Sequence, residues 1–355
     1  MFGSSCLPRL GLVSAICLAI ASVSVAQPVV GLGAIGDSYV AEYQFVVSRS
    51  TARGFVEQLA QYRGINVGSF RGAADLSWGP PRDRGYEYNW GQGSSTSLTA
   101  ISSGQHTGLA SQVTAGLVNY AVIATGGNDF ALPANYLNIY NGTLSGMALT
   151  TYISNTVNQV LTIHDLVRDA GANTVLVNIG DLSNSRAIQT TFTNPIFRDR
   201  VTQAISQANT QLQAAAAARN VPLVDVFQFG QLLNGNSATN NTLNISGVTM
   251  QTWSFTDNAQ NPSHWFEDSV HAGSVYHGLY SNMIMKGMNY YGAGLTPFTD
   301  QEIFANAGLT VFPPGPTNFN IDPYVIQPVP EPSGLLLLAA PLAMWLSRRK
   351  CLSAA

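Results

Sequence analysis

The stretch Val29-Val30-Gly31-Leu32-Gly33-Ala34-Ile35-Gly36-Asp37-Ser38 decides the fold, because an apolar run passes directly into small and polar residues. Residues 29–35 contain only apolar side chains and glycine, which predicts a short buried β-strand. Similar runs, rich in β-branched residues, predict further strands at residues 65–67, 120–124, 174–179 and 221–226. Ser38 then follows the end of the first strand.

Helical patterns separate these strands. They lie at residues 54–62, 107–118, 149–170 and 196–219. In the third segment Ile153, Val157 and Val160 recur at helical spacing, which predicts one apolar face packed on a sheet. Alternation of strands and helices favours an α/β fold whose mostly parallel sheet is covered on both faces. Functional groups of such folds gather at the carboxyl ends of the strands, where Ser38 is expected.

The amino-terminal segment is typical of a secretory signal peptide. Arg9 precedes a largely apolar run that closes on Ser24-Val25-Ala26, so we expect residues 1–26 to be removed.

The carboxyl-terminal segment predicts a sorting signal. The Pro-rich residues 311–333 end in Pro330-Glu331-Pro332, followed at 334–346 by an apolar run of 13 residues. A comfortable membrane span needs roughly 20 residues, so this run favours transient membrane contact. With its basic cluster at 348–350, the tail at 334–355 resembles the PEP-CTERM signal of Gram-negative bacteria, which implies a sorting protease of the exosortase type. An ordinary membrane anchor is the alternative.

Composition fits an exported domain spanning residues 27–310. All three cysteines, Cys6, Cys17 and Cys351, lie in the end segments, so the body has no disulfide and depends on its core. The net charge of the chain is −3, and the body is more acidic because Arg9 and the cluster at 348–350 lie outside it. This balance argues against a nucleic-acid-binding surface.

Four motifs in order resemble those of SGNH hydrolases, the GDSL esterase and lipase family. They are Gly36-Asp37-Ser38, with Tyr39 in place of the usual leucine, the loop at residues 88–97, Gly126-Gly127-Asn128-Asp129, and Asp268-Ser269-Val270-His271. The resemblance implies a flavodoxin-like, three-layer α/β/α fold with a mostly parallel five-stranded sheet. It also implies a carboxylic ester hydrolase that needs no cofactor or metal.

The chemistry of these residues agrees with that resemblance. A serine hydroxyl becomes a nucleophile when an imidazole takes its proton and a carboxylate orients the imidazole. Ser38, His271 and Asp268 are expected in these roles. The resemblance adds the backbone N–H of Gly93 and the side-chain amide of Asn128 as oxyanion donors, with Gly91 as a competitor of Gly93.

Three other interpretations carry less support. Gly31-Leu32-Gly33-Ala34-Ile35-Gly36 fits the dinucleotide fingerprint, but no acidic residue ends a second strand about 20 residues later. His264, Asp268, His271 and His277 match no common zinc spacing. His106 and His164 are expected to be ordinary helix residues. A noncatalytic, glycan-binding surface or matrix protein would have no need of the complete catalytic set.

The substrate class stays open between acylated glycans, lipids and small acyl esters. Trp90 and Trp265 lie beside the expected site loops, where their rings would stack on sugars or line an acyl pocket. The polar stretch at residues 233–263 is expected to form an insertion near the site. The end segments together predict export to the cell surface or extracellular matrix of a Gram-negative-type bacterium.

Overall fold

The computed structural model describes residues 27–45, 52–72, 74, 75, 77, 79, 82, 84–183, 185–235, 242–251, 266–309 and 320–328. The predicted signal peptide and the predicted anchor with its basic tail lie outside these residues. His264 and Trp265 lie outside them as well.

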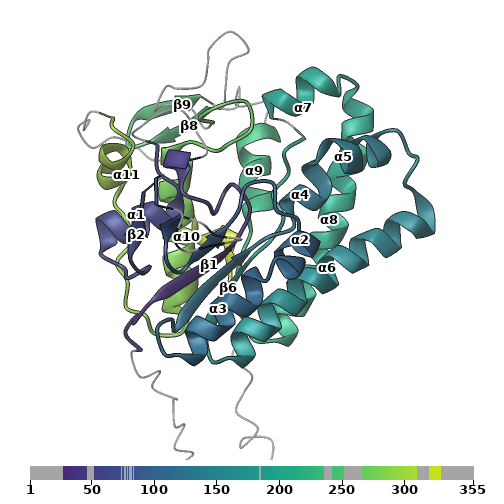
Figure 1. Cartoon of the computed structure of the whole chain (residues 1–355). Helices are drawn as coiled ribbons and strands as arrows, with labels where there is room; N and C mark the ends of the chain where they lie inside the picture. Colours follow the sequence, from purple (N-terminus) through teal and green to yellow (C-terminus); the bar gives the residue numbers. More distant parts are fainter. Residues whose placement is uncertain are drawn as a thin grey trace, which may run out of the picture.

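A six-stranded sheet in the order β10-β7-β6-β5-β1-β4 occupies the centre (Figure 1). Its strands are β1 (Leu32–Gly36), β4 (Asn89–Gly91), β5 (Tyr120–Ala124), β6 (Asn173–Val177), β7 (Leu223–Val224) and β10 (Val325–Ile326). The first five pair in parallel, and β10 runs antiparallel to β7 at the edge. The mostly parallel α/β architecture is therefore confirmed, with six strands where five were expected.

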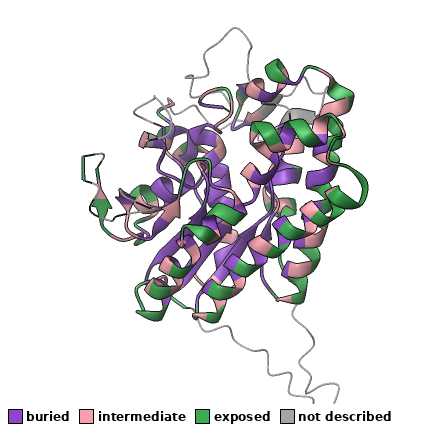
Figure 2. Ribbon diagram, turned by 45° about the vertical axis from the view of Figure 1, so that its right-hand side comes forward, coloured by how far each residue is buried: buried purple, intermediate pink, exposed green. Residues whose placement is uncertain are grey.

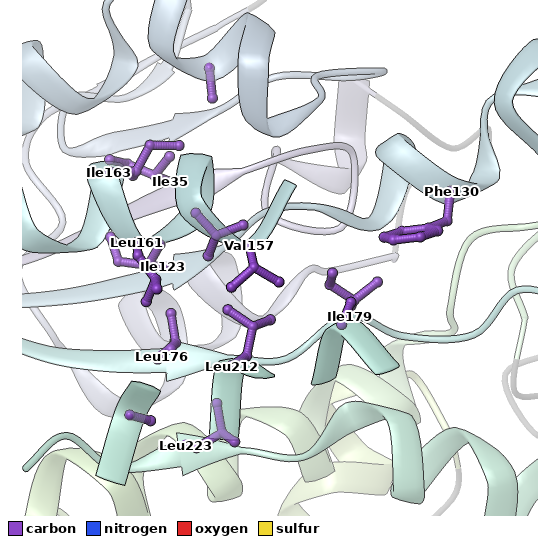
Figure 3. Packing of buried hydrophobic residues seen from close by; sticks show 14 of the residues in the cluster. Ile35, Ile123, Phe130, Val157, Leu161, Ile163, Leu176, Ile179, Leu212 and Leu223 are labelled. Carbon is purple, nitrogen blue, oxygen red and sulfur yellow. The ribbon is translucent and has the colours of Figure 1, made fainter. Parts of the chain in front are cut away.

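Helices cover both faces of the sheet (Figure 2). Strand residues alternate between the two hydrophobic layers. One face packs against α1 (Phe55–Arg63), α10 (Ser274–Asn289) and α11 (Asp300–Asn306). The other packs against α3 (Gln105–Thr114), α6 (Gly146–Asp169) and α8 (Pro195–Ala218). Figure 3 shows this second layer, where Ile35, Ile123 and Leu176 of the sheet meet Val157 and Leu212.

Shorter elements connect these layers. They are η1 (Tyr43–Phe45), α2 (Ser97–Ser102), α4 (Gly127–Ala131), α5 (Pro133–Tyr140), α7 (Arg186–Thr191), α9 (Val226–Gly235), η3 (Asp322–Tyr324) and the strand pairs β2 (Phe70–Arg71) with β3 (Gly85–Tyr86) and β8 (Thr242–Ile245) with β9 (Val248–Gln251). No helix in this part of the chain has the length and apolarity that crossing a membrane requires.

The strand expected at residues 65–67 does not form. The segment is irregular, although its backbone lies beside the start of β1: the Asn66 carbonyl accepts from the Leu32 N–H at 2.8 Å, and the Val67 carbonyl accepts from the Tyr88 N–H at 3.0 Å. The chain then returns through β3, and β4 pairs with the end of β1. Two separate segments therefore lie beside β1 on this side of the sheet.

Part of the predicted Pro-rich linker belongs to the sheet. The carbonyl of Tyr324, at the end of η3, accepts from the Asp225 N–H at 2.8 Å, and β10 then pairs with β7. The buried Val325 packs on the same core as α10. The prolines nearby suit an edge strand, which needs fewer ladder hydrogen bonds.

In the described part of the expected insertion at 233–263, residues 233–235 end α9 and residues 242–251 form the hairpin of β8 and β9. Its turn residues Ser246 and Gly247 have φ values of 50° and 80°, the left-handed pair that a tight hairpin of the primed type requires. Ile245 and Met250 are buried in the main core. The hairpin is therefore packed against the body.

The glycine run before Ser38 serves close packing within β1. A Cβ on Gly33 would lie 2.2 Å from a Leu109 methyl group, and a Cβ on Gly36 would lie 2.3 Å from the Ala124 carbonyl oxygen. The glycines thus lie in and before the strand, whereas a dinucleotide fingerprint follows one. This arrangement rejects the nucleotide-binding interpretation.

Candidate active site

Ser38 lies in a tight turn at the carboxyl end of β1. The Asp37 carbonyl accepts from the N–H groups of Val40 and Ala41, each at 3.0 Å, and an Asp37 carboxylate oxygen accepts from the Tyr39 N–H at 2.9 Å. Burial raises the pKa of Asp37 to about 6. Asp37 therefore holds the turn together, and the Ser38 side chain is left at the wall of a cavity of about 280 Å³.

His271 reaches the same cavity from the other end of the sequence. The antiparallel bridge between Phe266 and Ala272, together with a 2.7 Å bond from the Glu267 N–H to the His271 carbonyl, closes the loop that carries it. One Asp268 oxygen lies 2.7 Å from His271 Nδ1. The other accepts from the N–H groups of Val270 and His271 at 2.8 and 2.7 Å.

These contacts fix the imidazole. Burial raises the pKa of Asp268, but the hydrogen bond and charge of His271 and the two backbone N–H groups outweigh it, so the net pKa is below the ordinary value. An anionic Asp268 accepts the Nδ1 proton, which leaves Nε2 as the basic nitrogen of neutral His271. This is the tautomer that a general base needs.

Ser38 and His271 line one cavity, yet no hydrogen bond joins their side chains in the described part of the chain. The sequence predicts this bond. Such contacts are often long without substrate and tighten when it binds. In the described residues, the two side chains therefore line the same cavity without a direct hydrogen bond between them.

Asn128 also lines the cavity, from the first turn of α4. Its amide nitrogen donates to the Ser95 carbonyl at 3.1 Å. Since an amide nitrogen carries two hydrogens, one bond orients the group and one N–H remains for a ligand. The neighbouring Asp129 is buried and accepts from the backbone N–H and hydroxyl of Ser97, both at 2.8 Å, which fastens α4 to the 94–97 loop.

The predicted role of Gly93 does not fit the cavity. Ser94 lines it, whereas Gly93 and Gly91 do not. The Gly91 N–H donates to the Asn89 side chain at 3.1 Å, and a Cβ on Gly91 would lie 2.5 Å from the Ala41 nitrogen, so this glycine serves packing. Ser94 has φ of 63°, a strained value for a residue with a side chain.

The backbone N–H groups at the cavity give a second reason to prefer Ser94 over Gly93 as an oxyanion donor. In the described residues, neither the Ser94 N–H nor the Ser38 N–H donates a hydrogen bond within the protein. Both residues line the cavity, as does Asn128. Three donors are therefore available from three segments.

Tyr39 is a site residue that the sequence reasoning missed. Its hydroxyl donates to the Val270 carbonyl at 2.6 Å, which joins the Ser38 turn to the loop that carries His271. Burial raises the pKa of Tyr39 well above the ordinary value, so the hydroxyl stays protonated as a donor. The tyrosine after Gly36-Asp37-Ser38, where the GDSL motif that the segment resembles has leucine, was the available signal.

His277 has a structural place behind the site. Its Nδ1 accepts from the Phe55 N–H at 3.2 Å, and its Nε2 lies 2.6 Å from the Tyr43 hydroxyl. Burial lowers the pKa of His277 to about 3, so the ring is neutral. The described residues contain no group of three or more His, Cys, Asp or Glu side chains placed to bind a metal.

The remaining predicted residues lie away from the cavity. Trp90 donates to the Gln112 side chain at 2.9 Å and packs so closely on α3 that a Cβ on Gly108 would lie 2.0 Å from its ring. It therefore does not line the cavity for a sugar or acyl chain. His106 and His164 lie in α3 and α6, as expected.

Comparisons with known proteins give distant structural similarity. No family model matches the chain, and no curated protein matches it. A lipase from a goat rumen metagenome is 14% identical, with a TM-score of 0.45, over 74% of this chain and 98% of that one. An α/β hydrolase enzyme from the Lake Arreo metagenome is 14% identical, with a TM-score of 0.40, over 77% and 99%. A catalytic mutant of an acetylxylan esterase from Geobacillus stearothermophilus is 15% identical, with a TM-score of 0.36, over 75% and 94%.

Proposed function

We propose that this chain is a serine ester hydrolase of the SGNH type, acting through an acyl-enzyme intermediate. One observation carries the proposal: Ser38, Asn128 and His271, from three distant segments, line a single cavity, while Asp268 holds the imidazole from behind. A structural role for each residue alone would not require this convergence.

In the proposed mechanism, His271 Nε2 takes the Ser38 hydroxyl proton as Oγ bonds to the ester carbonyl carbon. The carbonyl π electrons move to its oxygen and return as the bond to the leaving oxygen breaks. The His271 imidazolium gives its proton to that leaving oxygen, which departs as the alcohol. Water then attacks the acyl-enzyme by the same sequence of proton transfers. Asp268 stays ionised and stabilises the imidazolium that forms in both halves.

Negative charge on the carbonyl oxygen needs donors that are already in place. The N–H groups of Ser38 and Ser94 and the free amide hydrogen of Asn128 are proposed for this role. Ser94 replaces Gly93 in the proposal, because Ser94 lines the cavity and its N–H is unused within the described structure.

The Ser38→Ala variant tests the proposal through hydrolysis of a series of p-nitrophenyl esters. Activity should fall to the level of buffer, while folding, followed by circular dichroism, stays unchanged. Ser94→Ala is the matched control, because it removes another hydroxyl from the same cavity and keeps the backbone N–H. Turnover in Ser38→Ala equal to that of the wild type would reject Ser38 as nucleophile. No turnover of any of these esters by the wild-type protein would favour the glycan-binding alternative.

Export and surface sorting are part of the proposal. They rest on the sequence of residues 1–26 and 329–355, which resemble a signal peptide and a PEP-CTERM tail. The proposed partners are an ester substrate, from the acylated glycans, lipids or small esters, and an exosortase-type protease. The acidic net charge gives no reason to expect a nucleic-acid partner.

A further inference from the structure

We propose that the cavity beside Ser38 binds the acyl part of the ester and prefers a linear chain of about six to ten carbons over acetyl. This inference rests on the proposed ester hydrolase function. It narrows the substrate class, which the sequence leaves open between glycan, lipid and small esters.

The cavity extends along the carboxyl edge of the sheet. Its wall includes Ser38 after β1, Ala124 at the end of β5, Val177 at the end of β6 and Val226 after β7, and these four strands are consecutive neighbours. Neighbouring strands lie about 4.8 Å apart, so the cavity spans about 14 Å from β1 to β7. An extended chain advances about 1.2 Å per bond, so this span sets an upper limit of roughly twelve carbons.

The volume admits a chain of several carbons. The cavity measures about 280 Å³. This is many times the space that one water molecule, which is about as large as a methylene group, requires. An acetyl group would leave most of this space without contacts.

Two polar side chains of the wall, Asn178 and Asp181, are already hydrogen-bonded within the protein. Asn178 donates to Asp225 at 2.7 Å and accepts from the Phe227 N–H at 3.1 Å. Asp181 accepts from the Ser183 N–H at 2.8 Å, from the Thr202 hydroxyl at 2.7 Å and from the Gln231 amide at 3.0 Å.

One hydroxyl of the wall, that of Thr125, is buried without a partner in the described structure. A sugar ring brings several hydroxyls, and each one buried against an apolar part of the wall without a partner would weaken binding. Beyond the reacting groups, the rest of the wall is largely aliphatic and aromatic, including Val177, Val226, Phe266 and Tyr280. A hydrocarbon chain suits this wall and a sugar does not.

The first experiment measures kcat/KM for p-nitrophenyl esters from acetate to dodecanoate, below their aggregation concentrations. Each buried methylene contributes about 0.8 kcal/mol, so kcat/KM should rise about three- to fourfold per carbon until the cavity is full. The optimum should lie between about six and ten carbons and decline beyond it. An optimum at acetate, or a flat profile, would overturn the inference.

A cavity-filling variant gives a sharper test. Gly230 of α9 lines the cavity, and a Cβ there would meet no atom within 4 Å, so Gly230→Leu adds a side chain without a backbone clash. The ratio of kcat/KM for octanoate to that for butyrate should fall at least about tenfold, because the longer chain loses burial. Gly72→Leu is the matched control, at an equally open glycine outside the cavity, and should keep the wild-type ratio.

A second variant, with a smaller added side chain, keeps the test available if Gly230→Leu does not fold. Gly180 also lines the cavity, and its added Cβ would lie 3.7 Å from Val226, an ordinary contact, so Gly180→Ala should lower the same ratio by a smaller factor. Unchanged ratios in both folded variants would overturn the inference. Turnover that is fastest with acetate would reject the acyl-chain inference alone. No turnover, together with a Ser38 that does not react with a fluorophosphonate, would reject the hydrolase proposal itself.

Discussion

At the scale of the residue, Tyr39 connects the two halves of the proposed catalytic apparatus. It directly follows Ser38, and its hydroxyl bonds to the residue before His271. Tyr39→Phe removes this bond and leaves the Val270 carbonyl without its partner. A loosened histidine loop should lower kcat about tenfold with little change in KM, which is a free-energy cost within the range for a lost buried hydrogen bond.

Tyr291→Phe is the control for that variant. The Tyr291 hydroxyl bonds to the Thr174 carbonyl at 3.0 Å, the same kind of contact, but Tyr291 does not line the cavity. Its loss should lower stability and leave kcat close to the wild-type value. Equal kcat values in the two variants would show that Tyr39 contributes only to folding.

Asn128 gives the second prediction at this scale. Asn128→Ala removes an amide that matters most when charge develops on the carbonyl oxygen, so kcat should fall about a hundredfold with a modest change in KM. Asn128→Asp should be slower still, because an anionic acceptor would face the oxyanion. Steady-state kinetics and circular dichroism check both variants. Values of kcat within about threefold of the wild type in both would leave Asn128 as a turn residue only.

Part of the lining of the cavity could be predicted from single residues, whereas the place of Gly93 outside it could not. Ser38, Asn128 and His271 stand in motifs whose side chains must meet, so their sequence positions were informative. Gly93 was chosen because glycine usually allows a close backbone approach. The loop instead turns so that Ser94, with a left-handed backbone, lies at the cavity, and sequence alone does not report the φ of a serine.

At the scale of the element, α10 depends on one neutral histidine. His277 joins α10 to the first residue of α1 and to Tyr43 of η1. Its pKa, lowered by burial to about 3, lies below the ordinary value of 6.5. Between these two pH values His277 is protonated in the unfolded chain and neutral in the folded chain. The free energy of unfolding therefore decreases as the pH falls.

The prediction is a difference in pH dependence. Between pH 7.5 and pH 5, the wild type should lose on the order of 1–2 kcal/mol more unfolding free energy than His277→Gln, which cannot titrate. Urea unfolding at the two pH values measures it. The variant is expected to be less stable overall, so only the change with pH is compared. Equal changes in both proteins would show that His277 accepts a proton without unfolding.

Four helices were predictable, whereas the 16-residue α10 and the two short strands at the sheet edges were not predicted. The four predicted helices correspond to α1, α3, α6 and α8, because each repeats its apolar face over several turns or has clear end signals. By contrast, β4 and β10 contain three and two residues. Their pairing with distant strands, rather than any local pattern, makes them part of the sheet.

At the scale of the whole molecule, one sheet separates two cores and gathers the site at one edge. Adjacent residues of β1 serve opposite layers, as Ala34 packs towards α1 and α10 while Ile35 packs towards α3 and α6. The strand is thus held on both faces, which fixes the Ser38 turn that follows it. The same edge carries α4 after β5 and the polar loop after β6.

The central claim is that this architecture activates Ser38, and covalent labelling tests it most directly. The full chain is treated with a fluorophosphonate, which reacts with activated serines, and the labelled peptide is identified by mass spectrometry. We expect one stoichiometric adduct on Ser38, absent in Ser38→Ala, retained in Ser94→Ala and formed much more slowly in His271→Ala. A folded wild-type protein whose Ser38 stays unlabelled, or whose label lies on another serine, would contradict the account.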